Sequence, residues 1–366
     1  MALHFSRDTK VYLKHSGRFW KIPVLDGFSF SQATNASEIT LSEMSTAGNK
    51  SRRARQMFND SYAPAEWSFQ SYMRPNTGLP AEDALWASFF TDSTFNNTSK
   101  TWGSTAISGS ATAGGMTVSS NSSDLSVLGT FDLYFVMGAT NSSSSSDFTT
   151  SSADGITIYE ISDCVVNEAS IDFDVDGIAT IGWSGFGKII TEAASMNTNN
   201  SALLEARNLN STSNYIRNRL TQLSISSSQA EGVVAGDYDV TLTGGNITFT
   251  NNITYLTPET LGRINQPLEH VTGTRTITGN FTAYLDSSAN KTIDLFENLI
   301  ESTSVITNEF NLKFDIGGGS CSISLPKCHL EIPQHSIEDV IALDTTFHAL
   351  PSDVNSADEV TITYSG

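Results

Sequence analysis

The sequence is short of positive charge. Its 366 residues include 20 Lys and Arg against 39 Asp and Glu, which gives a formal net charge of −19. Tight nucleic-acid binding depends on Lys and Arg that neutralise phosphates, so this composition argues against a surface that grips DNA or RNA. It does not exclude DNA that passes the protein without being held.

Cysteine and long apolar runs are also scarce. Three cysteines are an odd number without metal-ligand spacing, so the sequence predicts no disulfide framework. Residues 1–10 contain no apolar run that would act as a secretory signal, and no segment reads as a transmembrane helix. We therefore expect a soluble protein that folds in a reducing cytoplasm.

The sequence lacks a recognisable active site. It has no Gly-Lys-Ser/Thr phosphate loop, and Gly182–Gly187 does not lie between a strand and a helix as a dinucleotide loop would. The cysteines and histidines between residues 321 and 348 contain no pair at the close spacing of a zinc site. We expect no enzyme activity and no cofactor.

What the sequence does contain is an internal repeat. Residues 159–185 align with residues 323–349 at an offset of 164 without a gap, which places Cys164 on Cys328 and Trp183 on Phe347. Both stretches alternate apolar and polar residues at the two-residue period of a half-buried strand. Further matches follow upstream in the same order, so the chain is interpreted as a duplicated β unit.

Each half is expected to contain the same strands and one short helix. A first hairpin is predicted over Val11–Leu13 and Phe19–Leu25, turned at Ser16–Gly17. The helices are predicted over Ala81–Phe90 and Thr292–Glu301, each with one apolar face. The matched strands are Phe28–Ser31 with Ile247–Thr250, Trp67–Met73 with Gly279–Leu285, and Phe131–Phe135 with Phe310–Phe314.

These matches predict two domains, residues 1–190 and 213–366, with a linker at 191–212. The first domain contains polar inserts at 91–130 and 141–154 that are rich in Ser, Thr, Gly and Asn. Such inserts can bury little apolar surface, so we expect them on an exposed face outside the core.

The order of the elements resembles that of bacteriophage tail tube proteins. The first half is similar apart from its inserts, and the resemblance implies a mainly β fold with two tandem β-sandwich or barrel-like tube domains, each flanked by a short helix. The segments of the second half that carry it are Gly245–Thr250, Thr276–Leu285, Thr292–Glu301, Ile323–Lys327, Thr346–Leu350 and Val360–Tyr364.

The resemblance implies a structural virion protein. Tube proteins of this kind form rings whose inner strands join around a channel, and the rings stack into the tail tube that conducts the genome into the host cell. Subunits with two tandem domains form homotrimeric rings with pseudo-sixfold symmetry. The implied partners are further copies of the chain and other tail proteins such as the tape measure, baseplate and terminator. DNA passes through the lumen without specific binding, and no membrane is involved.

One set of acidic residues is a candidate for the lumen surface. Asp172, Asp174 and Asp176 share one side of a predicted strand, because Ile171–Val175 contributes three apolar side chains to the other side. The same register in the second half gives Glu338. An acidic strand that faces solvent outside, and only keeps the protein soluble, is the alternative interpretation.

A cluster of cations is a candidate for contacts between rings. Between residues 38 and 64 the strand pattern loosens, and Lys50, Arg52, Arg53 and Arg55 fall within six residues. A solvated loop is one interpretation of such a run. The other is an arm that reaches acidic residues of a neighbouring subunit.

Two other function classes stay open on the sequence alone. One is a different β-rich phage component of structural or adhesive type, such as a baseplate, capsid or fibre protein. The other is a carbohydrate-active enzyme that would use the carboxylates of residues 172–176 and exposed Trp residues.

Overall fold

The fold is mainly β, as the sequence predicts. The structure is a computed structural model, and it describes residues 3–39, 56–74, 82–96, 98–99, 101–102, 107–109, 115–120, 128–142, 147–197, 203–204, 215–227, 236–301, 309–337 and 339–365. Its described α-helices are α1 (Asp83–Phe90) and α2 (Thr292–Glu301). None of the helices in these ranges is long and apolar enough to cross a membrane.

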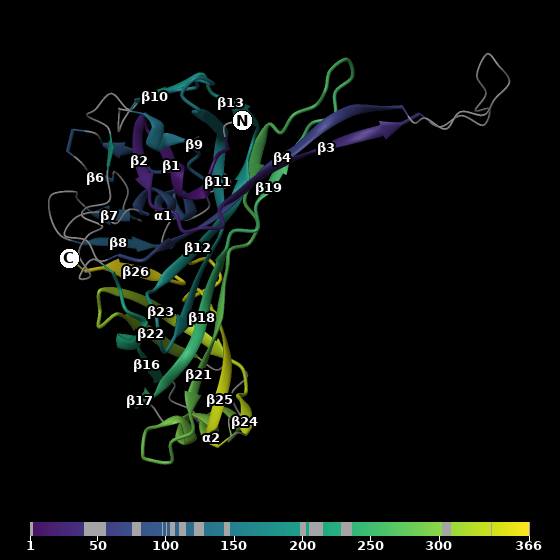
Figure 1. The fold of residues 1–366 in the computed structure, drawn as a ribbon. Helices are drawn as coiled ribbons and strands as arrows, with labels where there is room; N and C mark the ends of the chain where they lie inside the picture. Colours follow the sequence, from purple (N-terminus) through teal and green to yellow (C-terminus); the bar gives the residue numbers. More distant parts are fainter. Residues whose placement is uncertain are drawn as a thin grey trace.

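Apart from the inserts of the first half, two halves of the chain contain corresponding elements in the same order (Figure 1). One long strand of the first half takes the place of two strands of the second. The first half consists of β1 (Lys10–His15), β2 (Arg18–Ile22), β3 (Ser29–Glu38), β4 (Met57–Tyr72), α1, β9 (Phe131–Met137), β11 (Thr157–Asp174), β12 (Thr180–Gly187) and β13 (Ile190–Glu192). The second half consists of β16 (Gln222–Ser227), β17 (Gly236–Val240), β18 (Leu242–Thr250), β21 (Thr276–Tyr284), α2, β22 (Phe310–Ile316), β23 (Cys321–Leu330), β24 (Gln334–Ile337), β25 (Ile341–Ala349) and β26 (Thr361–Tyr364).

The hairpin predicted at the N-terminus is present. Strands β1 and β2 pair up to His15 and Arg18, which leaves a two-residue turn of Ser16 and Gly17. Both turn residues have positive φ, 50° and 73°, as the turn that best matches the twist of a hairpin requires.

The halves also share a kinked strand pairing around the repeated cysteine. In each half a β-bulge lies between two aligned strand pairs, and each thiol points at the carbonyl oxygen three residues earlier. The equivalent pairs are Phe131↔Cys164 and Leu133↔Ile161 in the first half, and Phe310↔Cys328 and Leu312↔Leu325 in the second. The offset of 164 residues found in the sequence therefore relates equivalent positions in three dimensions.

The bulge lets one strand serve two sheets. The N-terminal part of β11 pairs with β9 and β13, and its C-terminal part pairs with β12 and β18. In the second half β23 pairs with β22 and β26 at one end and with β25 at the other. Each half is therefore built from two sheets that share a strand and enclose a core.

The largest sheet runs through both halves. Its strand order is β3–β4–β12–β11–β18–β21–β25–β24, all antiparallel. The two halves meet where Glu168–Asp174 of β11 pairs with Gly244–Thr250 of β18. We call this eight-stranded sheet the main sheet.

The core is continuous beneath this junction. Helix α1 lies under the main sheet, where the Trp86 ring is 4.8 Å from Trp183 of the first half and 5.5 Å from Phe249 of the second. The sequence predicts one apolar face for this helix, but all eight of its residues are buried. The reason is that chain from both halves covers it, whereas α2 keeps Glu297 exposed.

Described parts of the insert at 91–130 pack in the core, so the prediction that the insert lies outside the core is wrong for these parts. Its strands β7 (Ile107–Gly109) and β8 (Met116–Ser119) pair with each other, and β8 pairs with β26 of the second half. Ile107 and Val118 are 0% exposed. A few large apolar side chains spaced along a polar segment are enough to bury these strands in part. The insert also contains β5 (Phe95–Asn96) and β6 (Thr101–Trp102), whose Trp102 is buried.

The segments predicted as a second insert and as a linker also contribute strands. In the second insert, β10 (Asp147–Thr149) buries Phe148, which contradicts an entirely exposed position. Strand β10 pairs with β14 (Ser195–Asn197), and β15 (Leu203–Leu204) pairs in parallel with β2. Part of the stretch 191–212 thus extends the sheets of the first half.

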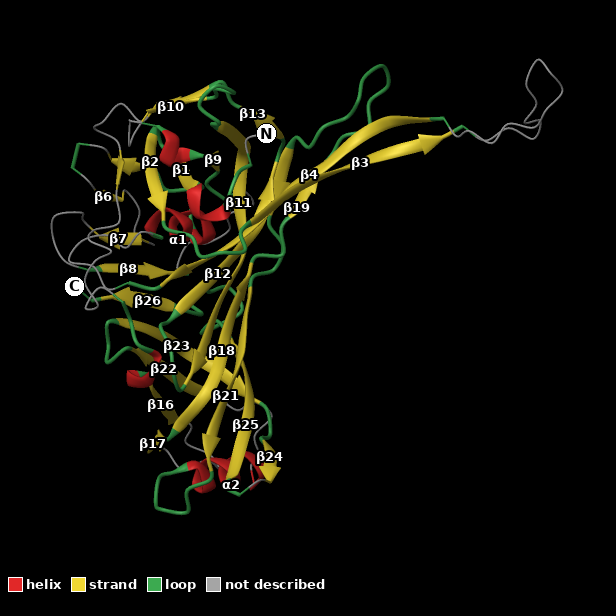
Figure 2. Cartoon of the chain, viewed as in Figure 1, coloured by secondary structure: helices red, strands yellow, loops and turns green. Residues whose placement is uncertain are grey.

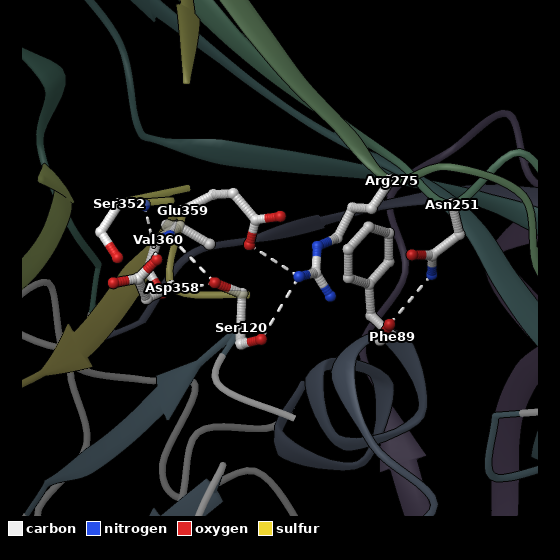
Figure 3. Close-up of polar contacts among 8 residues, drawn as sticks. All are labelled: Phe89, Ser120, Asn251, Arg275, Ser352, Asp358, Glu359 and Val360. Atoms are coloured by element: carbon white, nitrogen blue, oxygen red, sulfur yellow. Dashed lines mark hydrogen bonds and ion pairs between the residues drawn. The ribbon is translucent and has the colours of Figure 1, made fainter. Parts of the chain in front are cut away.

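Polar contacts lock the two halves together beside α1 (Figure 3). Arg275, just before β21, makes an ion pair of 2.7 Å with Glu359 and donates to the Ser120 carbonyl at 3.3 Å. Its guanidinium also stacks 5.6 Å from the centre of the Phe90 ring. Ser120 and Val360 exchange backbone and side-chain hydrogen bonds. The insert, helix α1 and the C-terminal strand are therefore held as one unit.

Two carboxyl groups are buried at the start of α1. Asp83 accepts a hydrogen bond of 2.9 Å from the Trp102 indole, and Glu82 accepts one of 3.3 Å from the Tyr364 hydroxyl. Burial raises the pKa of each carboxyl to about 7, although Arg74 opposes the shift of Glu82. Burial lowers the pKa of nearby His15 to about 4.

A core substitution in the insert should destabilise the protein. Ile107→Ala removes a fully buried side chain, and we expect the free energy of unfolding to fall by about 2–5 kcal/mol. The matched change Ser108→Ala, at an exposed neighbour, should alter it by less than about 0.5 kcal/mol. Urea unfolding of both variants tests this, and equal small effects would place the insert outside the core.

The buried acids should make stability fall as pH rises. Between about pH 4 and 7 the unfolded chain ionises Glu82 and Asp83 while the folded protein keeps them protonated, so their stabilising effect is complete below pH 4 and is lost towards pH 7. His15 acts in the opposite sense, because only the unfolded chain protonates it between pH 6.5 and 4.

Comparing variants separates the two effects. The variant Glu82→Gln with Asp83→Asn keeps both hydrogen-bond acceptors and removes only the acid titration. Its stability relative to the natural sequence should rise from pH 4 to pH 7, by on the order of a few kcal/mol at about 1.4 kcal/mol per pKa unit. Parallel stability profiles over this range, from chemical unfolding, would contradict the burial of charge-sensitive acids here.

Candidate assembly surface

Within the described residues, most of one face of the main sheet is not covered by other parts of the chain. Along each strand the apolar residues point into the core and the intervening residues point away from it, as in β12, where buried Trp183 precedes half-buried Ser184. Figure 2 shows α1 and strands such as β8, β26 and β22 on the core side of this sheet. The uncovered face consists mainly of Ser, Thr, Asn and Gln.

This face is acidic and free of strong cations. The eight strands of the main sheet contain no Lys and no Arg, although the chain has 20 of them. The uncovered face is therefore a polar surface of one sign, and most of its charge lies in the first half. Its acidic residues are Glu66, Glu168, Asp172, Asp174 and Asp344.

The structure divides the predicted lumen candidates. Asp172 and Asp174 lie exposed on the uncovered face, opposite the buried Ile171 and Phe173. Asp176 does not share their strand, because β11 ends at Asp174 and the chain turns before Gly177, which has φ of 111°. The expectation of a longer strand is wrong there.

Around this turn the side chains take other positions than predicted. Asp176 approaches Arg219 at 3.6 Å, and Val175, expected in the core, is 47% exposed. Glu338, the candidate from the second half, lies outside the described residues. The alternation along β18, β21 and β25 instead places Asp344 on the uncovered face of that half.

Three acids of this face were missed by the sequence reasoning. Glu66, Glu168 and Asp344 each have no other acidic residue within three positions in the sequence, so they form no visible cluster. The two-residue alternation could have located them, if it had been followed through every strand that matches between the halves.

The main sheet ends in two strands with open edges. Within the described residues β3 pairs only with β4, and β24 pairs only with β25. All four residues of β24 are exposed, and Ile337 is 80% exposed. An exposed edge strand with an apolar side chain is a template for pairing with another chain.

Strands β3 and β4 continue beyond the body as an arm. Figure 1 shows them running out together from the upper end of the main sheet. Their pairing extends to Glu38↔Met57, and Met57 and Phe58 are more than half exposed. Lys50, Arg52, Arg53 and Arg55, predicted to contact a neighbouring ring, lie outside the described residues. Only the base of the predicted arm is therefore described.

The described residues contain no cluster that could hold a metal. No group of three or more His, Cys, Asp or Glu side chains comes together among them. Cys164, Cys321 and Cys328 are all buried as free thiols, and burial raises the pKa of each. The notable surfaces of the described chain are its sheet edges, its arm and the uncovered face.

Comparison with known proteins agrees with this architecture. Residues 34–364 match the family described as phage tail tube protein. One similar protein is "Tail tube protein pb6" of Escherichia phage T5, 28% identical over 379 residues, which cover 98% of this chain and 75% of that protein. Both matches extend across the two halves, so the chain belongs to the phage tail tube protein family.

Proposed function

We propose that the chain builds the tail tube of a phage virion as rings of three copies, stacked along a channel through which the genome passes into the host cell. The observation that supports this best is the main sheet, which has an uncovered face without Lys or Arg and two open end strands. Structural polymerisation uses both features, and catalysis uses neither.

The junction inside the chain is a template for the junction between copies. Strand β11 corresponds to β23 and β24, and β18 corresponds to β3. The internal pairing of β11 with β18 therefore has a counterpart in which β24 of one copy pairs with β3 of the next. Such pairing removes both open edges, and it does so completely only when the ring closes.

The duplication supports a ring of three copies. One chain supplies two similar units, so three chains supply the six units of a pseudo-sixfold ring, as the resemblance to tandem tube proteins implies. The main sheets of three copies would contribute twenty-four strands to the wall. The further partners we propose are the tape measure, baseplate and terminator proteins of the tail.

The uncovered face would line the channel. A wall with cations would hold DNA at each phosphate, whereas a polar wall with scattered carboxylates repels it weakly. Asp172 and Asp174, with Glu66 and Glu168, make the first half the more acidic, and Asp344 alone serves the second. Around a ring of three, acidic and nearly neutral segments would alternate.

The arm would join successive rings. It projects past the end of the main sheet (Figure 1). The cations Lys50, Arg52, Arg53 and Arg55 would meet acidic residues of the next ring, in a protein whose net charge of −19 offers many such partners.

Disulfide trapping tests the edge pairing and the ring size together. The internal pair Ser170↔Thr248 corresponds, at offsets of 164 and 219 residues, to Gln334 of one copy and Ser29 of the next. Assembled Gln334→Cys, Ser29→Cys protein should form, on oxidation, a covalent ladder that ends at three chains, because residues opposite each other on paired strands lie within disulfide reach.

Each single-cysteine variant is the control for the ladder. It should give none, because the three natural cysteines are buried. A ladder that extends to six chains, or ends at two, would contradict the trimeric ring. Absence of a ladder in assembled rings would contradict the pairing of β24 with β3.

A charge reversal tests the channel wall. Asp172→Lys with Asp174→Lys should leave rings and tubes intact but lower genome delivery, because six added cations per trimeric ring would face DNA. The matched control is Asp237→Lys at an exposed site on β17, outside the main sheet. Plating efficiency of phage assembled with each variant decides it, and equal delivery would place Asp172 and Asp174 away from the lumen.

A further inference from the structure

The second half has its own hairpin at the position of the arm. In the first half the arm connects β3 with β4, and in the second half residues 251–275 connect the corresponding strands β18 and β21. They form a short hairpin of β19 (Thr254–Leu256) and β20 (Glu269–Val271) with a loop between them. We call residues 251–275 the brace hairpin.

The base of the brace hairpin is fastened to the first half of the chain. Here His270 is 1% exposed, and Ile253 packs with Leu128 and Val165 of the first half. Hydrogen bonds that cross between the halves include Asn251 Nδ2 to Phe89 O at 2.9 Å, Ile253 N to Asn167 Oδ1 at 2.8 Å, and Leu128 N to His270 Nε2 at 2.8 Å.

The tip of the brace hairpin contacts the arm. Asn265 forms a one-residue parallel bridge with Ser61 of β4. The amide of Tyr62 donates to the Asn265 carbonyl at 2.9 Å, and the amide of Asn265 donates to the Asp60 carbonyl at 3.1 Å. These bonds use the edge of β4 that faces away from β3, so the base of the arm has a third neighbour there.

The tip is itself held in shape. The Asn265 side-chain oxygen accepts hydrogen bonds from the Thr260 amide at 3.0 Å and from the Thr260 hydroxyl at 2.8 Å. Arg263 Nε donates to the same hydroxyl at 2.9 Å. The loop therefore presents the Asn265 backbone to β4 in a fixed conformation.

A two-stranded ribbon that leaves a sheet bends and twists easily, because nothing packs on its faces. Beyond Ala65, where β4 last pairs with β12, the arm is such a ribbon. We propose that the brace hairpin is a positioning element that holds the arm of its own chain at a set angle, through the backbone of Asn265. The hairpin of the second half thereby sets the angle of the corresponding hairpin of the first half.

The use of this device rests on the proposed function, in which arms join successive rings. An arm that is already held at a fixed angle in the free subunit loses less conformational freedom when it binds the next ring. Of the six hairpins in a ring of three chains, three would then reach the neighbouring ring and three would direct them.

Two proline substitutions remove the bridge from opposite sides. Asn265→Pro deletes the donor to Asp60, and Tyr62→Pro deletes the donor to Asn265. The edge of β4 already contains Pro64, two residues from Tyr62 on the same side of the strand. The matched control is Gln266→Pro, an exposed neighbour whose amide donates no backbone hydrogen bond among the described residues.

Electron–electron distance measurements read the arm angle in the unassembled protein. Spin labels at Ala36→Cys on the arm and Ser195→Cys on the body both occupy exposed sites, and the natural cysteines are buried. We expect one narrow distance distribution in the labelled natural background and in Gln266→Pro. In Asn265→Pro and Tyr62→Pro the distance distribution should become broad. A narrow, unchanged distribution in both bridge variants would overturn the proposal.

Tube growth is measured separately. Both bridge variants should still close rings, since their main-sheet edges are intact, but should form shorter tubes than Gln266→Pro by electron microscopy. Tubes of normal length in both variants would overturn the role in stacking. Failure of the natural protein itself to form tubes would instead contradict the proposed function, while the distance measurements would still decide whether Asn265 sets the arm angle.

Discussion

The architecture depends on the backbone pairing between β11 and β18. It converts two four-stranded sheets, each with open edges, into one sheet whose inner edges are satisfied. The same duplication leaves the equivalent edges, β3 and β24, unpaired by any other strand that the structure describes. An open edge is an aggregation hazard in a monomer, but between identical copies it can close into a ring. In the proposed ring, the pairing of β11 with β18 is therefore the internal counterpart of the contact between copies.

The burial of α1 is a consequence of that pairing. Because the main sheet continues across the junction, α1 is covered by β12, β18 and the insert, and Trp86 contacts aromatic rings from both halves. Burial extends to Glu82 and Asp83, whose carboxyls lose water and hold their protons more tightly. The contacts of Tyr364 and Trp102 keep one oxygen of each acid bonded. The core that joins the halves thus disfavours the ionised forms of Glu82 and Asp83.

The sequence was informative wherever one face of a strand is buried. Alternation located the repeat, the hairpin at Ser16–Gly17 and the strands around Cys164 and Cys328, and the bounds of α2 were predicted to the residue. It failed in the arm, because Ala33–Glu38 is exposed on both faces and a two-sided ribbon has no alternation to detect. It failed in the insert because Ile107 and Val118 are isolated apolar residues in a polar segment. At the polar face it located Asp172 and Asp174 but not the turn that removes Asp176.

Two units in one chain can differ from each other, whereas six identical subunits of a ring cannot. In a ring of identical chains every copy has the same arm and the same wall, so a change in one is a change in all. In this chain the halves diverge where the shared sheet does not constrain them. The first hairpin is long and reaches out, the second is short and folds onto its partner at Asn265. The acids of the uncovered face diverge in the same way, concentrated on one half. The strands between them retain their common order because an error there would leave backbone groups unpaired.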